Sequence, residues 1–507
     1  MSADGPAPDD AALPGPVPDV LARAYDPERF RADGHRVIDG LADHLAACVP
    51  TAATAPDDRP VIPYRPPGDA LARWPADYGE HPGADDALAA VLAATATDSI
   101  RLHHPRYLGH QVPPPLPAAA LADAAAALLN NGMAVYEMGG AATPQELAVI
   151  AWMARTLGLP ATAGGLLTSG GSLGNLTALL AARQVVAGHD VWRGGAHAGP
   201  PLAALVGATA HYSVARAVRA LGWGDGGAVE VACDDAYRMR ADDLPRAHAA
   251  AVAAGRRPIA VVASAGSTAT GAYDPLPAIA DFCARAGLWL HVDGAHGAAA
   301  ALSPRHRHLV AGIERADSVV WDAHKLLAMP ALCTAVLYKD EAHAYAAFAQ
   351  EASYLFAPDR EWWNLGLRTM ECTKRMMGTI LDASLRTCGV GFFRAYVERV
   401  FALGRALAAR LAAAPDFELA TAPDANIVVF RYRPTPALTG LALDELQAAL
   451  RRRCLEAGRW YFLTARPGGR HGASLWLRTA LMNPLAGAAE LDGLLAAIRE
   501  AGAGAAT

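Results

Sequence analysis

Four short segments carry side chains that could do chemistry, and each falls where an apolar run gives way to a helical pattern. The first, WDAHKLLAMPALCTAVLYKD, places Lys325 just past an expected strand, directly after His324. Burial among small apolar residues would favour the neutral amine, which is the nucleophilic form. Taken alone, Lys325 could equally be a surface lysine at the start of a loop.

The second segment, LWLHVDGAHGAAA, ends an apolar strand on Asp293. A carboxylate in this place is costly to bury unless it is paired. A protonated pyridine nitrogen is a suitable partner, because the ring then stays able to accept electrons. The alternative is that Asp293 only caps a helix.

The third segment, LLTSGGSLGNLTALLAAR, is a glycine-rich turn between a short apolar run and a helical pattern. Such a turn places backbone N–H groups and the Ser172 hydroxyl at a helix N-terminus, which is a site for a phosphate. An ordinary tight turn is the alternative. The sequence has no G-x-x-x-x-G-K-[ST] pattern, so it is not a P-loop.

The fourth segment, ATAHYSVARA, places His211 after the apolar run LAALVGATA. An imidazole there could stack on a flat aromatic cofactor or be a hydrogen-bonded core histidine. The phosphate turn, His211, Asp293 and Lys325 follow one another along the chain, and together they supply the groups that pyridoxal 5'-phosphate (PLP) needs. We therefore predict a PLP enzyme in which Lys325 holds the cofactor as a Schiff base.

The elements that would position these groups are strands alternating with helices. Strands are expected at 258–265, 288–293 and 317–322, and helices at 177–188, 213–222 and 275–287. This alternation predicts a mainly parallel sheet covered by helices on both faces. Ligands of such sheets bind at the carboxyl ends of the strands, where the four segments lie.

The rest of the chain divides by texture into four expected parts. They are a disordered tail (1–16), an N-terminal helical segment (17–100), a large PLP-binding domain (101–378) and a small C-terminal α+β domain (379–507). In the small domain we expect helices at 391–413, 442–457 and 487–501, with apolar strands within 426–434 and 474–484.

Composition is that of an ordinary globular protein. The 507 residues are 53% hydrophobic and 19% charged, with a formal net charge of −6 and no long basic run, so nucleic-acid binding is not expected. The seven cysteines are scattered without a C-x-x-C pair, which favours neither disulfides nor a metal site. No apolar run reaches the roughly 18–20 residues of a membrane span, and the first residues do not resemble a signal peptide, so we expect a cytoplasmic protein.

The chain resembles the group II PLP-dependent amino acid decarboxylases, which act on glutamate, cysteine sulfinate, diaminobutyrate or aromatic amino acids. The run GIERADSVVWDAHK (312–325) is the most specific part of the resemblance. The other matching segments are HPRYLGHQ (104–111), NNGMAVYEMGGAATPQE (130–146), TSGGSLGNLTALLAAR (168–183), HYSVARA (211–217), SAGSTATGAYDPL (264–276), HVDGAHGA (291–298), ASYLF (352–356) and LRTALMNP (477–484).

The resemblance implies a fold type I enzyme, like the aspartate aminotransferases, with active sites at a homodimer interface. By position, Lys325 is the Schiff-base lysine preceded by His324, Asp293 pairs with the pyridine nitrogen, and His211 and Ala295 lie on opposite faces of the ring. Gly171, Ser172 and Thr268 would contact the phosphate or the phenolic edge. Arg478 matches an arginine that meets the substrate carboxylate in glutamate decarboxylases, and His110 lies near where those enzymes place a glutamine.

Three departures from the family pattern stand out. The usual Asp-Ala-Ala is Asp293-Gly294-Ala295, and ECTKRMMGTILDASLRTCG replaces the usual Cys-x-Arg-Arg segment. The loop APDREWWNLGLRTM (357–370), which we expect to be exposed, mobile and able to close over the substrate, lacks the tyrosine that typically protonates Cα.

The predicted reaction is α-decarboxylation of an L-amino acid to an amine and CO2. Without a loop tyrosine, Lys325 or His324 would have to help return the proton to Cα. The missing tyrosine leaves open an alternative, decarboxylation coupled to oxidative deamination by O2, which yields an aldehyde. Another PLP reaction, such as that of a β-lyase, or a regulatory relative, also stays open. The HPRY and ASYLF segments favour the glutamate, cysteine sulfinate and diaminobutyrate side of the family over the aromatic side.

Overall fold

The computed structural model describes residues 16–51, 58–74, 78–81, 83–330, 332–348 and 363–503. Its chain forms two compact units. The first comprises Met1–Asp58 and Arg65–Ile100, and the second comprises Arg59–Tyr64 and Arg101–Thr507. The finer four-part division expected from the sequence stays a prediction.

The first unit is helical in its described residues. Its helices are α1 (Asp19–Ala24), α2 (Pro27–Cys48), α3 (Pro67–Ala72) and α4 (Ala87–Asp98). α1 and α2 are separate helices because a new helix starts at Pro27. Asp26 caps α2 by accepting a hydrogen bond from the Glu28 backbone N–H at 3.0 Å, and Pro27 occupies the first helical position.

The second unit is built on a larger sheet of seven strands within the described residues, in the order β1-β7-β6-β5-β4-β2-β3. All its strands are parallel except β7, which runs antiparallel to both β1 and β6. The strands are β1 (Gly164–Thr168), β2 (Leu202–Gly207), β3 (Ala228–Val231), β4 (Arg257–Ser264), β5 (Trp289–Asp293), β6 (Ser318–Asp322) and β7 (Thr334–Tyr338). The predicted mainly parallel sheet is confirmed, and β4, β5 and β6 are the three expected strands.

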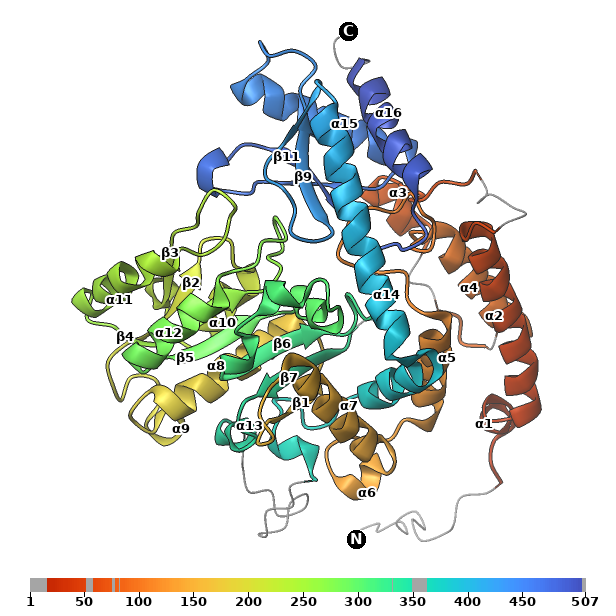
Figure 1. Ribbon diagram of the computed structural model, residues 1–507. Helices are drawn as coiled ribbons and strands as arrows, with labels where there is room; N and C mark the ends of the chain where they lie inside the picture. Colours follow the sequence, from red (N-terminus) through yellow and green to blue (C-terminus); the bar gives the residue numbers. More distant parts are fainter. Residues whose placement is uncertain are drawn as a thin grey trace, which may run out of the picture. The chain divides into compact units, whose positions relative to one another are not determined.

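Helices cover both faces of this sheet (Figure 1). Because side chains alternate along a strand, Val261 belongs to the hydrophobic cluster that includes residues of α7, α11 and α12, while its neighbour Val262 belongs to the cluster that includes residues of α8 and α10. The helices of this part are α5 (Pro117–Leu129), α6 (Tyr136–Gly139), α7 (Ala142–Leu157), α8 (Gly171–Val186), α9 (Val191–Gly194), α10 (Tyr212–Ala220), α11 (Leu244–Ala253), α12 (Leu276–Ala286) and α13 (Ala342–Ala346).

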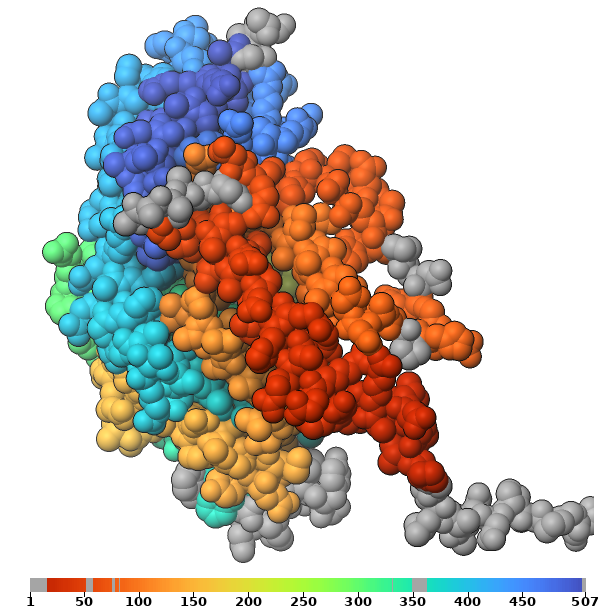
Figure 2. All heavy atoms as spheres, turned by 90° about the vertical axis from the view of Figure 1, so that its right-hand side faces the viewer, coloured from red at the N-terminus to blue at the C-terminus, as the bar shows by residue number. Residues whose placement is uncertain are grey.

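The long helix α14 (Met377–Ala413) runs from the large sheet to the C-terminal part of the unit. α14 contacts both α5 and α7, and in Figure 2 its cyan atoms lie beside the light-orange atoms of the same unit. The expected helix at 391–413 is only its second half. The helix is kinked at Gly389, which has a φ of 71°, a value that glycine adopts without strain. The kink joins two helical halves.

A second, antiparallel sheet forms the C-terminal part, in the order β10-β11-β9-β8. Its elements are β8 (Phe417–Leu419), β9 (Ile427–Tyr432), α15 (Gly440–Ala457), β10 (Leu463–Ala465), β11 (Trp476–Ala480) and α16 (Ala488–Ala503). Phe430, Leu477 and Ile498 belong to its separate hydrophobic core. The predicted α+β character of this part is confirmed.

Candidate active site

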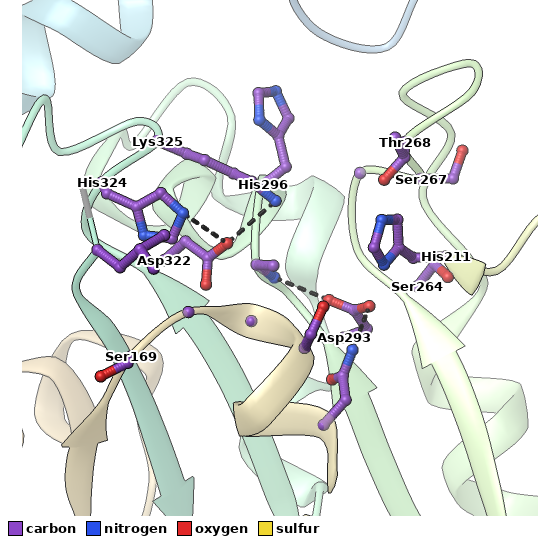
Figure 3. Close-up of a pocket in the computed structure, with 17 residues that line it drawn as sticks. Ser169, His211, Ser264, Ser267, Thr268, Asp293, His296, Asp322, His324 and Lys325 are labelled. Atoms are coloured by element: carbon purple, nitrogen blue, oxygen red, sulfur yellow. Dashed lines mark hydrogen bonds and ion pairs between the residues drawn. The ribbon is translucent and has the colours of Figure 1, made fainter. Parts of the chain in front are cut away.

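A cavity of about 380 Å³ lies at the carboxyl ends of the large sheet's strands. It is bounded by the turn after β1, the start of α10 and the segments that follow β4, β5 and β6. Figure 3 shows Lys325 and His324 on one side, His211 and Thr268 on the other, and Asp293 below. All eight residues predicted to hold the cofactor line this cavity: Gly171, Ser172, His211, Thr268, Asp293, Ala295, His324 and Lys325.

Lys325 follows the end of β6, and its side chain is 19% exposed. Its Nζ lies 3.0 Å from Asp322 Oδ2, an interaction drawn as a dashed line in Figure 3. The amine is thus held inside the cavity by a buried carboxylate.

Asp322 was not among the residues predicted from the sequence. It is the last residue of β6 and is 1% exposed. Thr334 Oγ1 donates to Oδ1 at 2.6 Å, and His324 Nε2 lies 3.5 Å from Oδ2. Burial works to raise the pKa of Asp322, but Lys325, His324 and the Thr334 hydrogen bond outweigh it and lower the pKa. A carboxylate ending a buried strand, the signal that singled out Asp293, could have found Asp322 too.

His324 is fixed by the segment that leads into β7. Its Nδ1 lies 2.9 Å from the Cys333 carbonyl oxygen and 3.3 Å from the Cys333 backbone nitrogen. The opposite ring nitrogen is the one that faces Asp322. When Nδ1 donates to the Cys333 carbonyl, Nε2 is left to exchange a proton.

Asp293 ends β5 and is 8% exposed. Asn175 Nδ2 donates to its Oδ2 at 3.0 Å, and the Ala295 backbone N–H donates to its Oδ1 at 3.2 Å. Two neutral donors hold the carboxylate in place without neutralising it. Its charge therefore stays available to a cationic group in the cavity.

Asn175, on α8, was also missed by the sequence reasoning. It links the two sides of the cavity floor, since the same Nδ2 donates to Ser213 Oγ at 2.9 Å. Its Oδ1 lies 3.0 Å from His291 Nε2, and His291 Nδ1 lies 2.8 Å from Ser318 Oγ. Burial lowers the pKa of His291 to about 4, although Asp293 works in the opposite direction. The sequence signal that could have identified Asn175 is a single amide side chain within an otherwise apolar helical pattern.

His211 is the N-cap residue of α10. Its Nδ1 accepts from the Ser213 backbone N–H at 3.3 Å and lies 2.7 Å from Ser213 Oγ. Burial lowers the pKa of His211, Asp293 works to raise it, and Lys325 lowers it further. A neutral, fixed imidazole on the cavity wall is suited to stacking on a flat ring.

The turn before α8, where the sequence predicts a phosphate site, forms one side of the cavity. Gly170 has a φ of 100°, which glycine adopts freely, and α8 begins at the next residue. Ser172 therefore lies in the first turn of a 16-residue helix, where backbone N–H groups favour a negative charge. Ser169 Oγ, before the turn, donates to Glu371 Oε1 at 2.6 Å.

The structure does not bring every predicted residue to the cavity. The two predicted substrate contacts, Arg478 and His110, are not among the described residues that line the cavity. Arg478, on β11, is 5% exposed and donates to the Thr268 carbonyl oxygen from Nε at 3.0 Å and Nη2 at 2.7 Å. Burial lowers its pKa to about 10. His110 is exposed, and its ring lies 5.7 Å from that of Tyr461.

The expectation of an exposed loop through residues 357–370 is wrong for its second half. Residues 357–362, with Trp362, lie outside the described residues. Asn364 is 2% exposed and accepts a hydrogen bond from the Tyr136 backbone N–H at 2.9 Å. Arg368 is fully buried and pairs with Glu341 at 2.6 Å. Packing and these polar contacts hold this half in place.

The donor set fits PLP. A helix N-terminus for a phosphate, a carboxylate held by neutral donors for a pyridinium, and an amine for a carbonyl meet in one cavity. In the part of the chain that the structure describes, no group of three or more His, Cys, Asp or Glu side chains could hold a metal ion. Nor is any described helix long and apolar enough to cross a membrane.

Comparison with known proteins decides the family. Residues 67–433 match the model described as the pyridoxal-dependent decarboxylase conserved domain. The chain belongs to this family. It is a fold type I, PLP-dependent amino acid decarboxylase of group II, as the sequence predicted.

Two relatives illustrate the range of the family. Cysteine sulfinic acid decarboxylase of Rattus norvegicus is 32% identical over 417 residues, covering 80% of this chain and 83% of the relative. Aromatic-L-amino-acid decarboxylase of Bacillus atrophaeus is 30% identical over 350 residues, covering 68% of this chain and 71% of the relative.

Solved structures agree on the fold. The crystal structure of mouse CSAD has a TM-score of 0.86 at 27% identity, over 94% of this chain and 99% of that chain. Rhodiola rosea 4-hydroxyphenylacetaldehyde synthase has a TM-score of 0.82 at 21% identity, over 94% of this chain and 98% of that chain. The second likeness shows the fold alone.

Proposed function

We propose that this decarboxylase removes the α-carboxyl group of an L-amino acid and releases an amine and CO2, with Lys325 as the residue that binds PLP. The observation that carries the proposal is the meeting of Lys325, Asp293 and His211 around one cavity. PLP, when bound, supplies the electron sink for the pair of electrons left by the departing CO2.

The chain's own residues have distinct proposed roles. Asp293 would keep a positive charge on the pyridine nitrogen, and His211 and Ala295 would hold the ring from its two faces. Gly171, Ser172 and Thr268 would bind the phosphate or the phenolic edge. Arg478 would meet the substrate carboxylate, and His110 would be a further contact of the substrate.

The proton that replaces CO2 on Cα needs a donor. We propose His324, because its ring is held by Cys333 and its Nε2 faces Asp322 in the cavity that also holds Lys325. An imidazole can both donate and accept a proton, which suits this role. Lys325 is the second candidate donor.

The attachment site is tested by borohydride reduction of the loaded enzyme followed by peptide mapping. The label is expected on Lys325, and Lys325→Ala is expected to lose the visible absorbance of the bound cofactor. A label on another lysine would contradict the assignment.

The reaction is tested by supplying common L-amino acids, with cysteine sulfinate, glutamate, diaminobutyrate and aromatic amino acids among them, and measuring CO2, amine, aldehyde and peroxide. We expect equal amine yields with and without O2. Aldehyde with ammonia and peroxide would instead identify the oxidative reaction, and no CO2 from any substrate would contradict decarboxylation.

We also propose that the enzyme works as a homodimer in the cytoplasm, with active sites at the interface. The family likeness supports the dimer, and the absence of disulfides among the described cysteines suits a reducing compartment. Light scattering of the active protein tests the dimer, and an active monomer would refute it.

A further inference from the structure

The ion pair of Lys325 and Asp322 poses a chemical problem. Their charged atoms lie 3.0 Å apart, and Asp322 is almost fully buried. Paired in this way, Lys325 is held as an ammonium. An ammonium has no lone pair and cannot attack a carbonyl, so its proton must leave before PLP can be attached.

The position of Asp322 is fixed from two further sides. Thr334 donates to Oδ1 at 2.6 Å, which leaves Oδ2 facing Lys325. A Cβ added to Gly171 would lie 3.1 Å from each carboxylate oxygen, so the carboxylate lies against the first turn of α8. The positive end of that helix favours the ionised form.

The other cavity carboxylate is not placed for this task. Asp293 accepts hydrogen bonds from Asn175 and from the Ala295 backbone on the cavity floor. In Figure 3 the dashed line from the Lys325 amine ends on Asp322, whereas Asp293 lies lower in the view, on the side opposite Asp322. His324 Nε2 is itself directed at Asp322 Oδ2.

We propose that Asp322 is the proton acceptor and donor for the attachment of PLP to Lys325. Asp322 Oδ2 takes one proton from Nζ, and the freed lone pair forms a C–N bond with the carbonyl carbon. A second nitrogen proton passes to the carbonyl oxygen. Asp322 then returns its proton to that oxygen, the C–O bond breaks, and water leaves. The product is a C=N bond bearing one proton beside an ionised Asp322. The inference rests on the proposed role of Lys325.

Attachment should therefore slow as pH falls and Asp322 becomes protonated. Although burial works to raise the pKa of Asp322, its neighbours lower that pKa, so Asp322 is ionised near neutral pH. The titratable groups that act on it come from four elements: His324 and Lys325 after β6, Cys333 before β7, His211 before α10 and His296 after β5. Burial lowers the pKa of both His211 and His296, so these rings are neutral at neutral pH.

The test uses the full-length protein, stripped of cofactor with hydroxylamine and mixed again with PLP or with phosphate-free pyridoxal. Absorbance of the C=N bond is followed by stopped flow at a series of pH values. Because positioned acid–base groups contribute about 10²–10⁴-fold, Asp322→Asn should slow attachment at least about tenfold with both carbonyl compounds. Asp322→Glu, which keeps a carboxylate, should recover part of the rate.

Comparing pyridoxal with PLP separates two possible effects of Asp322, because pyridoxal has no phosphate for the carboxylate to repel. If Asp322→Asn speeds attachment of PLP and leaves pyridoxal unchanged, Asp322 only repels the phosphate and the proposal is overturned. Unchanged rates with both compounds overturn it as well. Glu371→Gln is the matched control, since it removes a carboxylate bonded to Ser169 at the same edge of the cavity and should not slow pyridoxal.

Thr334→Val tests the same proton path while keeping the carboxylate. Losing the Thr334 hydrogen bond raises the pKa of Asp322, so the acid-side fall in attachment rate should move to higher pH. An unmoved pH profile would contradict the proposal. Borohydride labelling of wild type is done first, because a failure to label Lys325 would contradict the proposed function itself.

Discussion

Asn175 donates its side-chain amide to Asp293 at 3.0 Å, although the two residues are 118 positions apart in the chain. One lies in the second turn of α8 and the other ends β5. The same amide reaches Ser213, whose hydroxyl lies 2.7 Å from His211 Nδ1. The group proposed to bind the pyridine nitrogen and the ring proposed to stack on it are thus positioned by one side chain.

Asn175→Ala should weaken PLP binding about 10–100-fold, because hydrogen bonds to charged groups contribute about 1.5–3 kcal/mol. Absorbance titration of the stripped protein measures the dissociation constant. Ser213→Ala, which leaves the bond between Asn175 and Asp293, is the control and should have a smaller effect. Equal effects of the two variants would show that Asn175 does not act through Asp293.

Asp293→Asn should still bind PLP but lose about 10²–10³-fold in turnover, on the scale of a single electrostatic stabilising group. A neutral amide cannot keep the pyridine nitrogen protonated, so the ring becomes a poor electron acceptor. Steady-state rates and the absorbance of bound cofactor, measured on one preparation, separate turnover from binding. Near-normal turnover would leave Asp293 with a structural role only.

The buried pair of Lys374 and Glu146 should stabilise the turn that precedes α8. Lys374 Nζ contacts Glu146 Oε1 and the Leu167 carbonyl oxygen, each at 2.5 Å, and both side chains are 1% exposed. Lys374→Met leaves a buried carboxylate without its cation and should cost about 3–5 kcal/mol. Thermal unfolding measures the loss.

Two variants serve as controls for this pair. Adding Glu146→Gln to Lys374→Met should recover most of the stability, because the amide oxygen still accepts from the Leu167 backbone N–H. Arg375→Ala removes an exposed pair with Asp123 and should cost at most about 1 kcal/mol. A large loss in the second control, or no recovery in the double variant, would contradict the interpretation.

Stability should fall as pH drops from about 6.5 toward 4. Burial lowers the pKa of His291 to about 4 and that of His296 to about 3, so the unfolded chain takes up protons in this window that the folded chain refuses. His291 alone would account for about 3 kcal/mol. Urea unfolding of the stripped protein across this pH range measures the slope. His296→Gln should flatten it, and an unchanged slope would show that His296 does not contribute.

Much of the site could be predicted because its residues follow a local rule. Asp293 ends a buried strand, His211 and Lys325 each follow one within a few residues, and parallel strands bring their carboxyl ends to one edge. The rule also covers Asp322, which was overlooked beside the more conspicuous Lys325. Arg478 is different, since where its guanidinium lies depends on how β11 packs against the segment of Thr268.

The sequence by itself determined the order of the chemical groups, the mainly parallel sheet and the family. Periodic apolar patterns and polar strand ends are local, so they can be recognised without knowing which segments meet. Only the tertiary structure decided that Asn175 holds Asp293, that Thr334 holds Asp322, and that β7 runs antiparallel between β1 and β6. These contacts join residues that are distant in the chain or follow from which strands become neighbours. They are determined by close packing of helices and strands, and a local pattern of residues does not specify that packing.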